Sequence, residues 1–294
     1  MQYKTKGEKI FSVFNYLLLT FIGLTCLIPL LNILALSLSS KAAIGANKVT
    51  LFPVDFSLAA YKYALGNPKL LRALMISVIR VILGVGISLT VTILMAYPLS
   101  KDKNVFAKRN LYANIVLAHM LIGGGTVPMY ILLTNLHLLD TIWALVLPGA
   151  VASYNIILTQ NFFRSIPKEL EEAAFVDGAG SWRALFSIVI PLSKPVLATV
   201  TLFIAVSQWN SWFDGMIYMN SARNYPLQTY LQTLIVTDEM MANASVDLME
   251  QLMEVTSRNL TSAQIFIALV PIMVIYPMLQ KHFTKGIMLG SVKG

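Results

Sequence analysis

Polar and aromatic side chains at helical spacing inside apolar runs are the residues whose chemistry stands out in this sequence. The densest set is Ser207, Trp209, Asn210, Ser211, Trp212 and Asp214. Its polar members recur at intervals of three and four residues, which predicts a single stripe on one helix. Polar residues in a membrane span usually face the bundle interior, where they can hydrogen-bond a polar solute. The alternative is that they bond helix to helix, with the tryptophans in an interfacial aromatic belt.

Two other apolar runs carry similar groups. They are Tyr154, Asn155, Thr159 and Gln160 in one run and His119, Gly123, Thr126 and Tyr130 in the other, again at helical spacing. A buried histidine such as His119 is more often a hydrogen-bonded structural residue than a ligand. Arg80, also inside an apolar run, is expected to pair with a neighbour or to extend towards the interface rather than to bind a solute.

The residue types needed for catalysis or metal binding are scattered. The three histidines are His119, His137 and His282, and Cys26 is the one cysteine. They make no cluster that predicts an active site or a metal centre. The sequence also contains no Gly-x-x-x-x-Gly-Lys-Ser/Thr nucleotide-binding motif. We therefore expect a chain without catalytic residues and without a metal or other cofactor of its own.

The elements that position these residues are predicted to cross a membrane. Hydrophobic residues make up 56% of the chain, charged residues only 12%, and the mean hydropathy is +0.69. Average soluble chains carry roughly 25% charged residues. Six apolar runs reach the roughly 20 residues that a spanning helix needs. They lie near residues 11–38, 72–97, 110–134, 142–163, 193–217 and 262–280. The fold class is thus an all-α, polytopic membrane domain over residues 1–294, with the third run interrupted by glycines.

The net charge of +8 follows from membrane orientation rather than from a nucleic-acid partner. Six spans place both termini on one side, and that side carries about twice as many Lys and Arg residues as the other. The rule that basic loops stay inside then makes the termini cytoplasmic. The larger outer loops are residues 39–71 and 218–261.

One cytoplasmic segment, residues 165–191, is polar and has clear helix signals; we call it the polar segment. Ser165 and Ser181 are expected to cap two short helices, and Asp177-Gly178 to break the chain between them. Acidic residues in the first turn suit the helix dipole. An apolar surface beside these acids suits a groove on a partner protein, although a loop lying on the lipid surface would carry the same signals.

The polar segment resembles the coupling loop of ABC importer permeases, whose signature reads EAA, G, I, LP. Glu172-Ala173-Ala174 is followed after three residues by Gly178, after nine more by Ile188 and then by Ile190-Pro191. The departure is Ile190, where the family often has Leu. Matching stretches in chain order are Leu51–Pro53, Phe56–Tyr61, Ala96–Ser100, Gly123–Tyr130 and Phe283–Gly294. These stretches and Asp177-Gly178-Ala179 are similar to the carbohydrate-uptake, maltose-permease-like class. Tyr276-Pro277 with Leu279–Lys281 resembles its oligosaccharide and complex-glycan branch.

The resemblance implies a type I ABC importer permease fold in a bacterial inner or plasma membrane. It also implies four kinds of partner: a second, homologous permease in a heterodimer, two ATP-binding cassette ATPase subunits that use ATP and Mg, an extracellular or periplasmic sugar-binding protein, and a carbohydrate substrate. The ATPase-coupling residues would be Glu172, Ala173, Ala174, Asp177, Gly178 and Ala179. Substrate-pathway candidates are Asn210, Trp209, Trp212, Ser207, Asp214, Tyr154, Asn155, His119 and Tyr130.

An ion- or proton-coupled secondary sugar carrier is the alternative from another class. It predicts buried acids within the spans as ion sites, and Asp214 is the one candidate. A membrane-embedded enzyme would need a cluster of catalytic groups at bilayer depth, which the scattered histidines do not supply.

Overall fold

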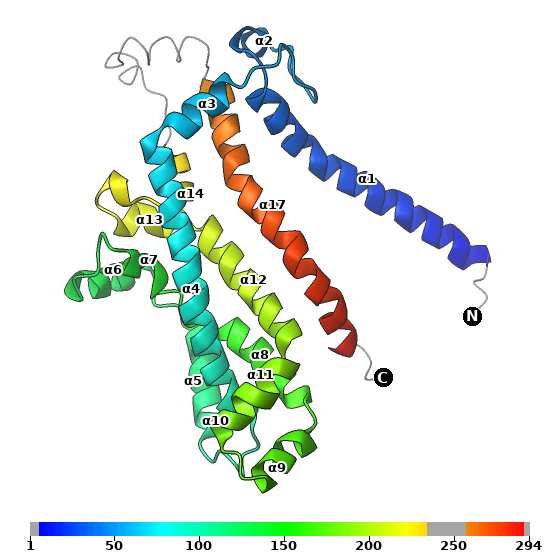
Figure 1. Cartoon of the computed structure of the whole chain (residues 1–294), viewed down its shortest axis with the longest axis vertical. Helices are drawn as coiled ribbons and strands as arrows, with labels where there is room; N and C mark the ends of the chain where they lie inside the picture. The colour runs from blue at the N-terminus through cyan, green and yellow to red at the C-terminus, as the bar shows by residue number, and fades with distance from the viewer. Residues whose placement is uncertain (1–5, 234–256, 291–294) are drawn as a thin grey trace. The chain divides into compact units, whose positions relative to one another are not determined.

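The computed structural model describes residues 6–233 and 257–290, and these residues form helices joined by loops, with one isolated β-bridge between Ser39 and Phe56 and no strand. The predicted all-α class is confirmed. The acidic, Met-rich part of the second outer loop lies outside the described residues. The helices are α1 Lys6–Ser37, α2 Lys41–Gly45, α3 Ala59–Gly66, α4 Pro68–Ser100, α5 Arg109–Leu121, α6 Thr126–Asn135, α7 Ile142–Val146, α8 Ser153–Ser165, α9 Lys168–Val176, α10 Ser181–Ala184, the π-helix η1 Leu185–Val189, α11 Ile190–Leu192, α12 Lys194–Asn210, α13 Phe213–Tyr218, the 3-10 helix η2 Ala222–Asn224, α14 Leu227–Gln232 and α17 Ser257–Gly290 (Figure 1).

Three of these helices contain stretches long and apolar enough to cross a membrane: Ile10–Ser37, Pro68–Ser100 and Arg258–Ile275. Two bent pairs bring the number in the described residues to five. They are α5 with α6, at 111°, and Ser181–Leu192 with α12, at 82°. The first bend lies at the predicted glycine interruption, where Gly125 has φ 78°. The predicted run 142–163 is divided between α7 and α8 around Pro148-Gly149, so the total of six spans stays a prediction.

The chain forms two compact units, Met1–Leu70 with Thr233–Val270 and Leu71–Gln232 with Pro271–Gly294. In the first unit α1 exposes apolar side chains along most of its length. A helix that is apolar all round is covered by lipid or by other protein in its native setting. The segment after α1 is ordered by local bonds: Ser40 caps α2 by accepting from the Ala43 N–H, and Ser37 Oγ bonds Tyr61 OH at 2.8 Å.

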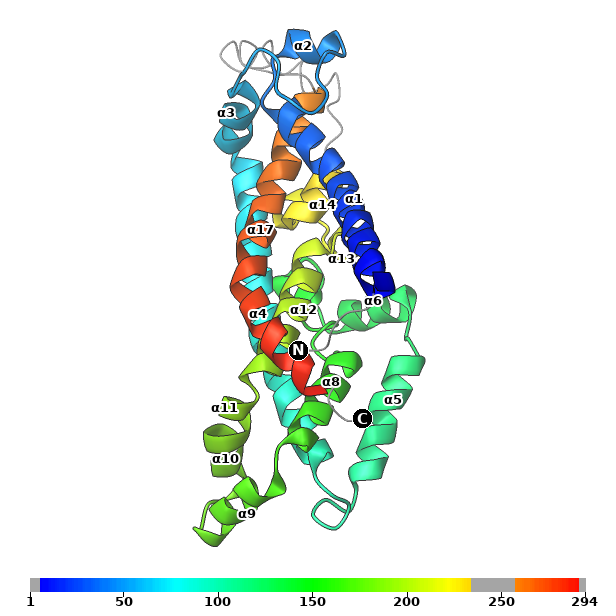
Figure 2. The same ribbon diagram turned by 90° about the vertical axis from the view of Figure 1, so that its right-hand side faces the viewer.

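The second unit contains every candidate site residue and three apolar cores. The core nearest the polar segment joins α4, α5, α8 and η1 through residues that include Ala96, Tyr97, Ile156, Phe163 and Leu185. A second core packs α12 against α4 and α8, and a third joins α6, α7 and the end of α13. Within this unit α9 and α10 lie at one end and α13 and α14 towards the other (Figures 1 and 2).

Candidate functional site

The polar segment folds into the predicted helix-turn-helix, but its helix starts differ from the prediction. Ser165 is the last residue of α8, and its hydroxyl donates to the Phe162 carbonyl at 2.7 Å instead of capping α9. Pro167 takes the N-cap position of α9, and Gly180 that of α10, without a side-chain cap. The predicted serine caps are therefore wrong. Glu169 and Glu171 do lie in the first turn of α9, where the helix dipole favours negative charge.

Gly178 ends α9 in a Schellman turn. Its φ is 81°, its N–H donates to the Phe175 carbonyl at 3.1 Å, and the Ala179 N–H donates to the Ala174 carbonyl at 2.9 Å. A Cβ at this position would meet no atom within 4 Å. Glycine is thus favoured at this position because the backbone is left-handed, and not because a side chain would lack space.

The α9 surface is uncovered within the chain. None of its residues is buried, and Val176 is 87% exposed. Leu170 and Phe175 are also exposed large apolar residues, and Glu172 and Ala173 are exposed, although Phe175 and Glu172 also line a cavity on the inner side of the helix. The candidate coupling residues Asp177 and Gly178 are exposed as well, while Ala174 and Ala179 are half-buried. This is an apolar surface flanked by acids, open to a partner.

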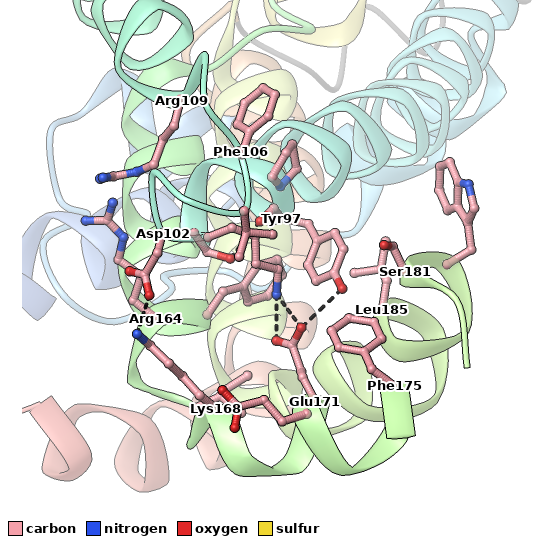
Figure 3. Close-up of a pocket in the computed structure, with 18 of the residues that line it drawn as sticks. Tyr97, Asp102, Phe106, Arg109, Arg164, Lys168, Glu171, Phe175, Ser181 and Leu185 are labelled. Carbon is pink, nitrogen blue, oxygen red and sulfur yellow. Dashed lines mark hydrogen bonds and ion pairs between the residues drawn. The ribbon is translucent and has the colours of Figure 1, made fainter. Parts of the chain in front are cut away.

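Two ion pairs tie α9 to Lys101 and Asp102, the two residues directly after α4 (Figure 3). Glu171 accepts from Lys101 Nζ, at 2.6 Å for Oε1, and from Tyr97 OH at 3.2 Å. Lys101 Nζ also lies 4.0 Å from the centre of the Tyr97 ring, a cation–π contact. Lys168 pairs with Asp102 at the surface. The hydrogen bond between them lowers the pKa of Asp102 and raises the pKa of Lys168.

Sequence reasoning missed Tyr97, Lys101 and Asp102 as parts of this site. Lys101 and Glu171 are 70 residues apart, so no local pattern relates them. The available signal was the family-like stretch Ala96–Ser100, which ends beside Lys101.

A cavity of about 770 Å³ lies behind α9. Its walls come from the end of α4, the loop after it, the end of α8 and the start of α10. Arg109 and Arg164 both donate to the carbonyl oxygen of Leu99, at 3.0 and 3.4 Å, and so cover the carboxyl end of α4. The cavity leaves unfilled space between α9 and the helix bundle, and the two ion pairs hold α9 in position.

The polar segment is joined firmly to the apolar core. Ala184, Leu185 and Val189 are buried, and the last two pack in the core with Ala96, Tyr97 and Phe163. Trp182 and Phe186 stack at 6.2 Å on the exposed face. Because Pro191 has no N–H to continue an α-helical ladder, a π-helix precedes it and the chain turns into α12 at Ser193. The packed helices therefore hold α10 and η1, and the turn at residues 177–180 joins α9 directly to them.

Comparison with known protein families shows to which family the chain belongs. The model of the family described as "Binding-protein-dependent transport system inner membrane component" matches residues 4–289. The chain belongs to this family. It is a permease, the membrane-embedded transport component of an ABC importer, and not an enzyme. Membership also implies cytoplasmic ATPase and substrate-binding protein partners.

Full-length relatives agree with this assignment. The permease is 40% identical over 292 residues to Protein LplC of Bacillus subtilis, covering 99% of this chain and 98% of the relative. It is 34% identical to the polygalacturonan/rhamnogalacturonan transport system permease protein YtcP of the same organism, covering 98% and 99%. A crystal structure of a bacterial ABC transporter involved in the import of the acidic polysaccharide alginate contains a chain with 32% identity and a TM-score of 0.86, covering 96% of this chain and 100% of that one.

The predicted stripe from Ser207 to Asp214 is not a single helix. The helix α12 ends at Asn210 and α13 begins at Phe213, with Ser211 extended at φ −71° and ψ 125°. Ser207, Asn210 and Trp212 are exposed in this chain, whereas Trp209 is buried. Asp214 pairs with Arg80, which confirms the predicted pairing of that arginine.

The other pathway candidates also divide between helices. His119 lies on α5 and Tyr130 on α6, so the bend at residues 122–125 breaks their predicted helical spacing. His119 Nδ1 bonds Ser153 Oγ at 2.8 Å, as expected of a structural histidine, but the residue is exposed and not buried as predicted. Tyr154 is exposed and its ring lies 6.4 Å from that of Phe203 on α12, while Asn155 is buried. Among the described residues, no group of three His, Cys, Asp or Glu side chains lies close enough to hold a metal ion.

Proposed function

We propose that this permease forms one half of the translocation pore of a bacterial importer for oligosaccharides released from complex polysaccharides. The support comes from the family match, from full-length similarity to a polygalacturonan/rhamnogalacturonan permease and from 32% identity to a chain of an alginate importer. The family-like stretches in the sequence point to the same substrate class.

The polar segment is the proposed attachment site for an ATPase subunit, with Glu172, Ala173, Ala174, Asp177, Gly178 and Ala179 at the contact. The observation that carries this proposal is the exposed, acid-flanked apolar surface of α9, whose inner side is tied to α4 by Glu171. ATP and Mg bind to the ATPases. Their closure moves α9, and the buried residues Leu185 and Val189 carry that movement into the bundle.

A second, homologous permease completes the pore, and a sugar-binding protein docks on the outer loops. The apolar helix α1, exposed along most of its length, supports a setting of lipid and partner helices. Both termini lie in the cytoplasm, because Lys and Arg are concentrated on their side of the predicted spans.

The pathway residues are proposed to be Ser207, Trp209, Asn210, Trp212, Asp214, Tyr154, Asn155, His119 and Tyr130. Asn210 and Trp212 flank the break between α12 and α13 and are exposed within this chain. Amide and indole groups can hydrogen-bond and stack on a sugar.

The function is tested with the complete complex purified with its partners and reconstituted in proteoliposomes. Uptake is measured for oligogalacturonides, alginate oligosaccharides and neutral malto-oligosaccharides, with the binding protein present. We expect uptake that requires ATP and persists when ion gradients are dissipated. Uptake that follows an ion gradient without ATP would favour a secondary carrier, and no uptake of any of these sugars would refute the substrate class.

The ATPase contact is tested by cross-linking. A single cysteine is placed at Val176 after Cys26→Ser, and we expect a bifunctional maleimide–lysine reagent to join this position to an ATPase subunit. The matched position is Trp182→Cys, exposed on the stacked face of α10. Equal cross-linking from both positions, or none from either, would contradict a contact centred on α9.

A further inference from the structure

Arg80 is a buried cation in the middle of an apolar helix. It is 2% exposed and lies on α4. A buried guanidinium is tolerated only when its charge is paired and its N–H groups are bonded. The partners of Arg80 therefore reveal what the residue holds in place.

The guanidinium is bonded on every nitrogen. Nε donates to Gln208 Oε1 at 2.8 Å, Nη1 to the Ser211 carbonyl at 3.3 Å and to Asp214 Oδ1 at 3.2 Å, and Nη2 to the Leu145 carbonyl at 3.5 Å. Nη2 also pairs with Asp214 Oδ2. Asp214 Oδ1 in turn accepts from Ser211 Oγ and from the Gly215 N–H, both at 2.8 Å. The network therefore brings together α4, α7, the end of α12 and the start of α13.

This network occupies the break between α12 and α13, residues 211–212. The arginine charge lies at the carboxyl end of α12, where it donates to the Ser211 carbonyl, and Asp214 lies in the first turn of α13. Both charges have the sign that the helix dipoles favour. A helix broken without Gly or Pro at the break needs such external partners, because the freed backbone groups would otherwise be unsatisfied.

Close packing fixes the same region from two further sides. A Cβ on Gly84 would lie 2.8 Å from Gln208, so this side chain rests directly on the α4 backbone. On the other side, Thr229 Oγ1 donates to the Trp212 carbonyl at 2.8 Å, and a Cβ on Gly215 would lie 2.1 Å from that hydroxyl. The orientation of Asn210 and Trp212 is thus set by residues other than themselves.

We propose that Arg80 is a positioning residue for substrate recognition. With Asp214 and Gln208 it holds the break so that Asn210 and Trp212 face the solute. The inference rests on the proposed function, since it concerns the same pathway. In this inference Asp214 is the counter-ion of Arg80 and not a group that contacts the solute, because both of its oxygens are engaged inside the protein.

The test compares three variants in the full complex: Arg80→Met, the double variant Arg80→Met/Asp214→Asn, and Arg80→Lys. The control is Arg72→Met, an exposed arginine on the same helix. Arg80→Met alone leaves a carboxylate without its partner and should lower complex yield tenfold or more. The double variant removes both charges and should recover the yield to within about twofold.

We measure the ATPase activity that depends on the binding protein, as a function of oligosaccharide concentration. The oligosaccharide is one that the wild-type complex transports. For the double variant we expect the half-saturating concentration to rise tenfold or more while the maximal rate stays within threefold. Arg80→Lys keeps the charge but not the forked geometry of the guanidinium. This variant should assemble, and its half-saturating concentration should rise threefold or more.

Recovery of both yield and half-saturating concentration in the double variant would overturn the proposal, because Arg80 would then only stabilise the fold. If the double variant does not assemble, a wild-type half-saturating concentration in Arg80→Lys overturns it. A fall in maximal rate alone would overturn it as well. A wild-type complex that transports none of the sugars would instead refute the proposed function, which separates the two failures.

Discussion

Two ion pairs, one on α4 and one directly after it, differ in what surrounds them. Arg80 and Asp214 meet in the bundle together with an amide and two backbone carbonyls. Lys101, directly after the same helix, and Glu171 have side chains 19% and 13% exposed and one further partner, Tyr97. In the first pair the Arg80 side chain is only 3% exposed, although Asp214 is 22% exposed, so removing Asp214 would leave a buried cation without its counter-ion. The second lies beside a cavity, at an edge that a partner can reach, so it can open and reform at lower cost.

The largest effect that follows from this contrast is expected at Gly215. Gly215→Val forces a side chain against Thr229 and should destabilise the permease by about 1–3 kcal/mol, the usual range for overpacking. We expect a lower Tm of the purified complex and partial recovery by Thr229→Ala, which removes the clashing hydroxyl. An unchanged Tm would mean that the α12–α13 break is looser than its contacts indicate.

Gly178 offers the opposite case, with open space but a left-handed backbone. Gly178→Val should cost about 1–2 kcal/mol in the turn alone. The complex should still assemble, with ATP hydrolysis no longer linked to uptake. Gly178→Asn is the matched control, since Asn tolerates this conformation, and it should keep coupled transport. Equal transport by both variants would remove the turn from the coupling path.

A smaller effect is expected when the Lys101–Glu171 pair is broken. Lys101→Met and Glu171→Gln should each lower sugar-stimulated ATPase activity by several-fold while the complex stays intact. In a double-mutant cycle on thermal stability their coupling energy should be about 1 kcal/mol or less. Lys103→Met, an exposed lysine of the same loop, should have no effect. Loss of assembly in the single variants would show that this pair is as fixed as that of Arg80.

The smallest effect concerns Asp102 and Lys168, whose side chains are 61% and 68% exposed. Because pairing lowers the pKa of Asp102 below 3.8, its contribution is present above that pH and is lost as the pH falls through the lowered value. Pairing raises the pKa of Lys168 above 10.5, so its contribution is lost only as the pH rises through the raised value. Both groups are therefore charged between pH 6 and 8, so the small effect of Asp102→Asn on transport should be the same across this range, and any stability difference should vanish at high salt. A clear change in transport over this pH range would contradict a surface pair.

The sequence predicted those parts of the structure that depend on local chemistry. The glycines at 123–125 predicted the interruption between α5 and α6, and Asp177-Gly178 predicted the turn after α9. The pairing of Arg80 was also predicted, because a buried arginine must find a partner. Each of these features follows from the conformational or solvation preference of a single residue type.

The break after Asn210 could not be predicted in the same way. Residues 207–214 hold no proline or glycine, and their spacing fits a continuous helix. The interruption is stabilised instead by Arg80 and Thr229, the first more than 100 residues away in the chain. The contacts of Glu171 with Tyr97 and Lys101 are equally non-local, so only the folded chain reveals them.

Because of the π-helix at Leu185–Val189, the structure depends on the number of residues in the polar segment as well as on their types. A π-turn accommodates one residue more than an α-turn, and each residue of an α-helix corresponds to a rotation of about 100°. Deleting a residue within the π-turn would return it to an α-turn without such a rotation, whereas a deletion elsewhere between Gly178 and Pro191 would rotate α9 by about 100° about the axis of this helix. The number of residues between these two positions is therefore expected to tolerate substitution much better than insertion or deletion.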